Sequence, residues 1–201
     1  MIISFLRWFT FAVSLIWVLI YFKGGLAVIN DNKQTAVSSE IIDKYHYTVP
    51  IFFISFAGST MFLTQILICL GITDASLRAE YLLTVISGVI LVIVGIMTEF
   101  WIRYRYLGRF WSGGVEIQEN HQVIAEGPYR IVRHPLYAGN LLIYPGAVLT
   151  FNVWWNWMAC IVVIAGYIYL AAYEDRFLEN NLPGYREYQK MTKYKLLPGI
   201  W

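Results

Sequence analysis

Long apolar runs constrain this chain more than any other feature of its sequence. A helix needs about 20 apolar residues to cross the hydrocarbon of a bilayer, and several stretches of the 201-residue chain approach that length. We expect five membrane spans, at about residues 4–22, 48–72, 81–102, 136–151 and 153–173. Because only Asn152 and Val153 separate the last two, these should form a tight helical hairpin. The sequence therefore predicts an all-α integral membrane protein.

The composition agrees with a bilayer as the surroundings of most of the chain. Hydrophobic residues make up 58% and charged residues 14%, against roughly 45–50% and roughly 25% in soluble domains. The 15 basic and 13 acidic residues leave a net charge of +2. That charge is too small to indicate a nucleic-acid partner, and no basic stretch resembles a phosphate-binding arm. Nothing in the sequence specifies an oligomeric state.

The basic residues indicate how the chain is oriented in the membrane. Of the 15 Lys and Arg residues, all except Arg7 and Arg78 fall on one side of the five-span topology. Basic loops stay on the cytoplasmic side of membranes, so we expect a cytoplasmic C-terminus, in a bacterial inner membrane or the endoplasmic reticulum. The first apolar run is too long and too uniform for a cleaved signal peptide, and Phe22-Lys23-Gly24-Gly25 is a poor cleavage site.

The chain divides into two parts of different character. Residues 1–100 form a three-helix transmembrane region with few polar groups, whereas residues 101–201 carry most of the polar and turn-forming residues. The polar residues of the second part form three clusters: His121-Gln122-Val123-Ile124 followed by Gly127-Pro128-Tyr129-Arg130; Arg133-His134-Pro135-Leu136-Tyr137; and Glu174-Asp175. The predicted hairpin brings the last two clusters to one membrane face, where they should enclose a polar pocket.

Each of these residues can also be explained by a structural role alone. Arg130 and Arg133 could serve only as positive-inside anchors, and Asp175 is expected to be a solvated helix end. His134 lies between an arginine and a proline at a membrane boundary, where packing gives little reason for a histidine, so we expect it to be functional. For His121 the two interpretations are balanced. Glu99, near the end of the third span, could pair with a nearby arginine or reach the membrane surface.

A bound metal is not expected from this sequence. It has three histidines, no HExxH motif and no pair of cysteines at metal-ligand spacing. Cys69 and Cys160 lie inside apolar runs, as buried hydrophobic residues do.

Taken in order, the three clusters resemble the isoprenylcysteine carboxyl methyltransferase family, which is related to the membrane phospholipid N-methyltransferases. The resemblance covers about residues 105–201 and includes Leu178, Tyr185 and Tyr188 after the acidic pair. It implies a multi-helix membrane enzyme whose C-terminal half encloses S-adenosylmethionine near the cytoplasmic surface. The cofactor contacts that it implies here are His121, Gln122, Val123, Ile124, Tyr129, Arg133, His134, Pro135, Leu136, Tyr137 and Glu174. One helical turn before Glu174, where eukaryotic members have a substrate-facing arginine, this chain has Leu170.

The resemblance also suggests roles and an acceptor. Tyr129 and Tyr137 could face the sulfonium or the adenine, Glu174 could bind a cationic or hydroxyl group, and Arg133 or His134 could hold the methionine carboxylate. Since no residue stands out as a general base, we expect a lipophilic acceptor whose nucleophile is a carboxylate or thiolate.

Three alternatives remain. One is N-methylation of a phospholipid. Another is an NADPH-dependent sterol or acyl reductase with a similar C-terminal layout, although NADPH calls for more basic residues than Arg130 and Arg133. The third is a scaffolding membrane protein, which would leave the clustered polar residues without a purpose.

Overall fold

The computed structural model describes residues 1–35, 44–73, 82–111, 115, 117 and 120–201, without the side chains of residues 21–45, 47 and 109. Arg78 and the expected start of the third span at Tyr81 lie outside the described residues. Within them the fold is all-α, as predicted. The helices are α1 (Ile2–Thr35), α2 (Lys44–Cys69), α3 (Leu82–Ile102), α4 (Pro135–Phe151), α5 (Trp154–Asn181) and α6 (Tyr185–Met191).

Four helical segments of the described chain are long and apolar enough to cross a membrane: Ile2–Ile20, Thr48–Cys69, Leu82–Leu107 and Trp154–Asn181. They correspond to four of the five predicted spans. The remaining one, α4, has 17 residues, which at 1.5 Å per residue gives about 26 Å, somewhat short of the roughly 30 Å of hydrocarbon. Asn152 and Val153 separate α4 from α5, as the hairpin prediction requires.

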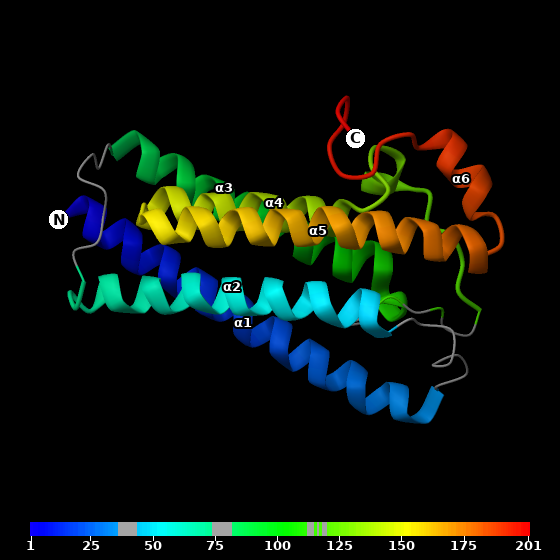
Figure 1. Cartoon of the computed structure of the whole chain (residues 1–201), viewed down its shortest axis with the longest axis horizontal. Coiled ribbons are helices and arrows are strands. Elements are labelled where there is room, and N and C mark those ends of the chain that lie inside the picture. Colours follow the sequence, from blue (N-terminus) through cyan, green and yellow to red (C-terminus); the bar gives the residue numbers. More distant parts are fainter. Residues whose placement is uncertain (36–43, 74–81, 112–114, 116, 118–119) are drawn as a thin grey trace.

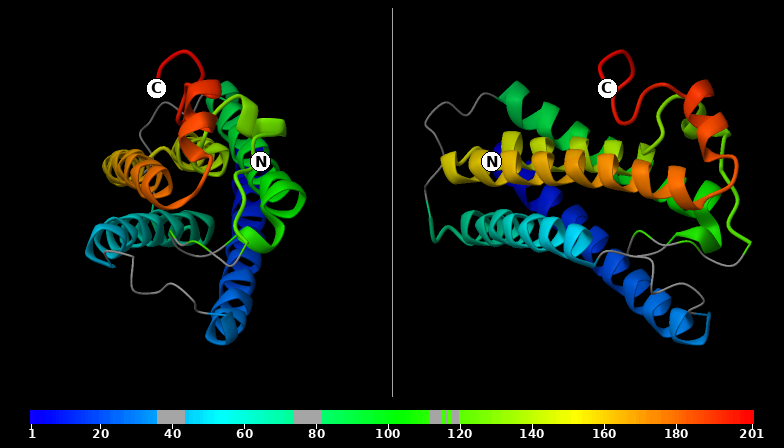
Figure 2. Two further views of the ribbon diagram at one scale, coloured as in Figure 1. Left: turned by 90° about the vertical axis from the view of Figure 1, so that its right-hand side faces the viewer. Right: turned by 45° about the vertical axis from the view of Figure 1, so that its right-hand side comes forward.

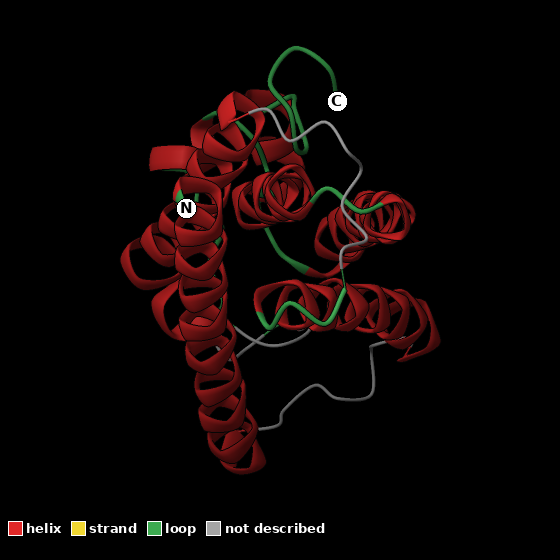
Figure 3. Ribbon diagram, turned by 90° about the vertical axis from the view of Figure 1, so that its left-hand side faces the viewer, coloured by secondary structure: helices red, strands yellow, loops and turns green. Residues whose placement is uncertain are grey.

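Helices α2, α3, α4 and α5 run alongside one another, whereas α1 crosses them obliquely, and the chain direction alternates from one helix to the next (Figure 1). Seen along the bundle, α4 is surrounded by other helices, with α3 and α5 beside it and α1 and α2 on one side (Figures 2 and 3). The ends of α3 and α5 and the beginning of α4 meet at one end of the bundle, where α6 also lies (Figure 1). We call this the α6 end. It is the end where the hairpin brings the sequence clusters together.

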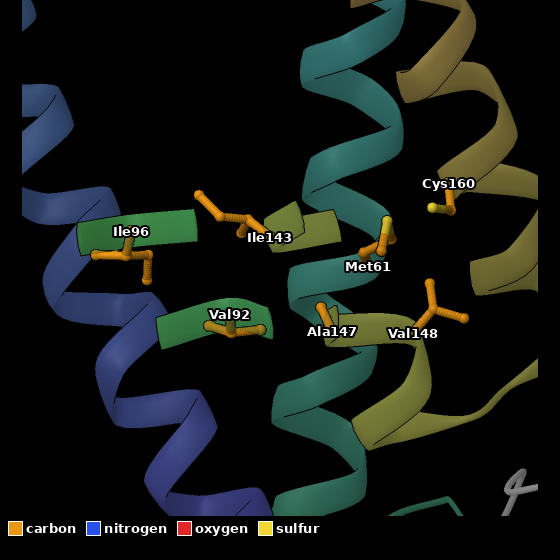
Figure 4. Close-up of a cluster of buried hydrophobic side chains, with 7 residues drawn as sticks. All are labelled: Met61, Val92, Ile96, Ile143, Ala147, Val148 and Cys160. Carbon is orange, nitrogen blue, oxygen red and sulfur yellow. The ribbon is translucent and has the colours of Figure 1, made fainter. Parts of the chain in front are cut away.

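Glycines allow α3 and α4 to pack backbone against backbone. A Cβ added to Gly88 of α3 would lie 2.6 Å from the carbonyl oxygen of Gly146, and one on Gly95 would lie 2.7 Å from that of Gly139. Because both pairs are seven residues apart, the two helices approach closely over two turns. Next to this contact lies an apolar core, made of Met61, Val92, Ile96, Ile143, Ala147, Val148 and Cys160 (Figure 4).

Polar side chains inside the bundle form hydrogen bonds between helices. Trp17 of α1 donates from Nε1 to Glu99 of α3 at 2.5 Å, and Glu99 is 3% exposed. Glu99, left open by the sequence, is therefore buried and hydrogen-bonded to an indole. At the opposite end of the bundle, Trp155 donates to Thr64 Oγ1 at 3.0 Å. Such bonds satisfy polar groups that would otherwise face hydrocarbon.

Beyond α3 the chain folds into short, irregular pieces at the α6 end. The π-helical turn η1 (Arg103–Leu107) and the 3-10 turn η2 (Gly108–Phe110) follow α3, and the 3-10 turn η3 (Gly127–Arg130) precedes α4. After α6 the chain returns past η3, where Val132 and Tyr194 form an isolated parallel bridge. These segments build the walls of the site.

The α3–α4 contact gives the first prediction. Replacing Gly88 with alanine places a methyl group 2.5 Å from Thr150 Oγ1 and 2.6 Å from a backbone oxygen. Since backbone cannot move aside cheaply, we expect a loss of about 1–3 kcal/mol, measured as a lower midpoint of thermal unfolding in detergent. Gly58→Ala of α2 is the matched control, because its methyl group would meet Tyr144 at an ordinary 3.4 Å. Equal shifts in both variants would contradict the close packing.

Candidate functional site

A cavity lies at the α6 end, between the last turns of α5, the first turns of α4 and the segments that follow α3. The space between its walls is about 1110 Å³, including the part open to solvent. Its walls are Ile51, Leu107, Phe110, Trp111, His121, Gln122, Val123, Ile124, Tyr129, Arg133, His134, Leu136, Tyr137, Asn140, Tyr167, Glu174, Leu178, Leu182, Tyr185 and Tyr188.

The cavity brings the sequence clusters together. Every residue that we predicted to contact a cofactor lines it, except Pro135. Pro135 is the first residue of α4 and is buried, a position that suits proline because the missing N–H needs no partner there. The gathering of residues from three distant segments is what the predicted hairpin required.

His134 lies at the N-cap of α4 between two carboxylates. Its Nε2 is 3.4 Å from Asp175 Oδ1, its Nδ1 is 3.6 Å from Glu174 Oε2, and its ring stacks on Tyr137. Burial by itself lowers the pKa of His134, but the hydrogen bonds with Asp175 and Glu174 outweigh burial and raise the pKa above its ordinary value. The site therefore favours the imidazolium, a cation at the start of a helix.

Asp175 is held by several hydrogen bonds and ion pairs. Arg133 donates from Nε to Oδ1 at 2.8 Å and from Nη2 to Oδ2 at 2.9 Å, which is the bidentate geometry of a strong ion pair. Tyr185 donates to Oδ1 at 3.0 Å, and Lys195 Nζ lies 3.7 Å from Oδ2. With 5% of its surface exposed, Asp175 is not the solvated helix end that the sequence suggested. The sequence did not reveal this burial, because the partners of Asp175 lie ten or more residues away along the chain.

Arg133 is a structural clamp, whereas Arg130 is exposed. Besides its two bonds to Asp175, the guanidinium of Arg133 donates from Nη1 to the carbonyls of Thr192 and Lys193, at 2.8 and 3.0 Å. These bonds use most of its N–H groups. The anchor interpretation thus fits the exposure of Arg130 but not the burial of Arg133.

Three tyrosines, Tyr129, Tyr185 and Tyr188, also line the cavity. Tyr188 donates to the carbonyl of Tyr129 at 2.7 Å, and Thr192 donates to the same oxygen at 3.1 Å. Burial raises the pKa of Tyr129, Tyr185 and Tyr188 above the ordinary value, and the Asp175 carboxylate raises that of Tyr185 further. All three hydroxyls thus stay protonated at physiological pH.

The segment after α3 closes the cavity with stacked rings. The ring of Phe110 lies parallel to that of His121, with centroids 4.7 Å apart, and the guanidinium carbon of Arg103 lies 3.4 Å from the centroid of Trp111. His121, for which the sequence left two interpretations balanced, is therefore part of the cavity wall.

Some wall residues escaped the sequence analysis. Tyr167 lies seven residues before Glu174 and so shares its face of α5, a helical spacing that could have revealed it. Asn140 is likewise a lone polar residue one turn after Tyr137 in an apolar run. Ile51, in contrast, comes from α2 in the first half of the chain. An isoleucine in an apolar helix gives no signal that it lines a site.

Comparison with known proteins agrees with this geometry. The sequence profile of the phospholipid methyltransferase family matches residues 83–183, about half of the chain and the part that builds most of the cavity. The chain belongs to the phospholipid methyltransferase family. This confirms the resemblance inferred from the clusters at the level of this family, which is related to the isoprenylcysteine carboxyl methyltransferases. The protein is thus an integral membrane protein of a methyltransferase family.

A curated relative covers a smaller region. The chain is 33% identical over 92 residues to the cobalt-zinc-cadmium resistance protein CzcN of Cupriavidus metallidurans. The match includes 43% of this chain and 41% of that protein. The chain therefore spans less than half the length of this relative.

The buried ion pair gives the second prediction. Asp175→Asn leaves the Arg133 guanidinium buried without its counter-charge, so we expect a loss of about 3–5 kcal/mol in unfolding free energy. The matched control is Glu179→Gln, one turn further along α5, because Glu179 pairs with Arg186 in an exposed contact at 3.3 Å worth about 0–1 kcal/mol. Thermal or denaturant unfolding in detergent measures both. If both variants lost a similar amount of unfolding free energy, the buried pair would stabilise the fold no more than the exposed pair does.

The raised pKa of His134 gives the third prediction. A folded-state pKa above the unfolded value of about 6.5 means that the imidazolium stabilises the fold fully below that pH, and that the contribution is lost as the pH rises through the folded-state pKa. The stability difference between the wild type and His134→Gln should therefore shrink from pH 6 to pH 9. A difference that is constant or grows with pH would contradict the assigned charge.

Proposed function

We propose that the protein is an S-adenosylmethionine-dependent methyltransferase that acts on a lipophilic acceptor. The observation that carries this proposal is the cavity, which lies inside the matched methyltransferase region and is walled by the three clusters of the C-terminal half. When bound, the cofactor supplies an electrophilic methyl group on a sulfonium. The task of the protein is then to align the acceptor with that methyl group and to exclude water.

The chemistry of the cavity wall fits this cofactor. The wall combines apolar side chains, which suit an adenine and a methylene chain, with a carboxylate, a histidine and several tyrosines. Glu174 keeps a quarter of its side chain exposed, so its carboxylate can accept hydrogen bonds from hydroxyl or ammonium groups. The faces of Tyr129 and Tyr137 can attract a sulfonium by a cation–π interaction.

His134 and the beginning of α4 are suited to a carboxylate. The histidine is held as a cation by its two acidic neighbours, and the first amides of α4 have no partners within the helix. Arg133 was an equal candidate in the sequence, but its donors are largely used by Asp175 and two carbonyls. We therefore assign the carboxylate contact to His134 and a positioning role to Arg133.

The protonation states favour an acceptor that needs no general base. The contacts with Asp175 and Glu174 raise the pKa of His134 and so favour its protonated form, and the raised pKa values of Tyr129, Tyr185 and Tyr188 keep their hydroxyls neutral. These groups are therefore poorly suited to take a proton from a substrate. A carboxylate or a thiolate is already deprotonated. We therefore propose such a nucleophile, as in isoprenylcysteine carboxyl methylation.

A phospholipid amine is the second candidate, and the family match is the observation that favours it. An ammonium group must lose a proton before it can attack, and Glu174 is the carboxylate of the cavity wall that could receive it. The NADPH alternative is less well supported, because Arg130 is exposed and does not line the cavity, while Arg133 is engaged by Asp175.

The acceptor is proposed to reach the cavity sideways from the bilayer. Ile51 of α2 and Tyr167 of α5 belong to the wall, and both lie in membrane-spanning segments. An apolar chain could therefore remain in the hydrocarbon while its polar end meets the cofactor. From the distribution of basic residues in the sequence, we propose that the α6 end faces the cytoplasm.

Cofactor binding is the direct test. Loss of a hydrogen bond to a charged group removes about 1.5–3 kcal/mol, so Glu174→Gln should weaken S-adenosylhomocysteine binding about 10–100-fold. Calorimetric titration of the purified protein in detergent measures this. Glu179→Gln, on the same helix but away from the cavity wall, should bind like the wild type. If the wild type binds NADPH and not S-adenosylhomocysteine, the protein is a reductase instead.

A further inference from the structure

The last residue of α6 and the segment after it expose apolar side chains outside the membrane-spanning helices. Met191 is 71% exposed and Ile200 is 78% exposed, and Leu197 and Trp201 are exposed as well. Exposing several apolar side chains together to water is unfavourable, and such patches mark surfaces that contact a protein or a membrane. We call residues 191–201 the C-terminal strap. Its backbone is nevertheless well fixed, since the amides of Lys195 and Leu196 donate to the carbonyl oxygen of Trp201 at 2.9 and 3.0 Å.

The strap turns back along the bundle rather than away from it. After α6, the chain runs back over the outside of α3, α4 and α5, toward the middle of the helices, on the side opposite α1 and α2 (Figures 1 and 2). Near the α6 end, α3 and η1 also carry the exposed aromatic residues Trp101 and Tyr104. Tryptophan and tyrosine are the residues that mark the membrane–water interface. The exposed Trp101 and Tyr104 thus indicate that the interface is expected near the α6 end.

The charges beside these apolar residues are mainly positive. From α6 to the end of the chain there are four basic residues and one acidic residue, Glu187. Lys190 and Lys193 are exposed, and Lys195 covers the ring of Trp201, with its Nζ 4.6 Å from the ring centroid. A surface that combines exposed apolar and basic side chains fits the headgroup region of an anionic bilayer.

We propose that the C-terminal strap docks into the surface of the protein's own bilayer, with Ile200 and Trp201 among the lipid headgroups and Lys190 and Lys193 on anionic lipid. The strap is continuous with helices that already stand in that bilayer, so docking requires no further partner. Its position at the interface also holds the site. The carbonyls of Tyr194 and Lys195 accept the backbone amides of Arg133 and His134, each at 2.9 Å.

The depth of the strap can be measured without any assumption about catalysis. A fluorophore on Ile200→Cys, with both native cysteines replaced, is placed in nanodiscs that contain headgroup-labelled nitroxide lipid. The matched control is the same label on Arg186→Cys, an exposed residue of α6. We expect at least threefold stronger quenching at position 200 than at position 186. Equal quenching, together with full access of aqueous iodide to position 200, would overturn the proposal.

Native tryptophan provides a second measurement if the cysteine-free protein does not fold. The loss of fluorescence caused by brominated lipid is compared between the wild type and Trp201→Phe, and we expect a smaller loss in the variant. An unchanged loss would mean that Trp201 does not reach lipid.

Lipid charge tests the role of the lysines. Quenching at position 200 should be at least twofold stronger in phosphatidylglycerol discs than in phosphatidylcholine discs, and Lys190→Gln with Lys193→Gln should remove that difference. Quenching that does not depend on lipid charge would overturn the anionic docking. Protection from iodide that appears only when the protein forms dimers would assign the surface to a second copy of the chain, and would equally overturn it.

Discussion

The buried ion pair between Arg133 and Asp175 holds the functional end of this molecule together. Removing two charges from water is costly, and their attraction compensates only if the geometry is good and the remaining polar atoms are satisfied. Both conditions are met, because the pair is bidentate and both carboxylate oxygens have further partners. The remaining donors of the arginine reach the carbonyls of Thr192 and Lys193. One interaction thereby joins the end of α5, the beginning of α4 and the strap.

The charged residues of the site fall into two groups: those engaged in this ion pair and those that can contact a ligand in the cavity. Asp175 is occupied by its ion pair, whereas the neighbouring Glu174 faces the cavity. The same division holds between Arg133, which is engaged by Asp175, and His134, whose pKa is raised by its contacts with two carboxylates. Successive residues on a helix point about 100° apart, so adjacent residues with similar charge can serve different purposes. The cavity thus receives one carboxylate and one imidazolium in fixed positions.

Much of the architecture could be predicted from the sequence because it follows from local rules. The apolar runs identified the helices, and the two residues between α4 and α5 specified a hairpin that brings distant clusters together. The burial of Asp175 could not be predicted, since it depends on Arg133, Tyr185 and Lys195 meeting in three dimensions. Ile51 was missed for a related reason, because the packing of α2 on α5 leaves no polar mark in the sequence.

Methyl transfer itself is the most direct measurement of what the cavity does. Membranes containing the wild type or Glu174→Ala are incubated with S-adenosylmethionine carrying a radiolabelled methyl group, and the organic-soluble fraction is counted before and after mild alkali. We expect label in lipophilic product only with the wild type. Mild alkali should release that label as volatile methanol if the acceptor is a carboxylate, and should give no volatile label if the acceptor is a thiol or an amine. If the organic-soluble label in wild-type membranes does not exceed that of Glu174→Ala and of membranes without the protein, the cavity does not serve methyl transfer to a lipophilic acceptor.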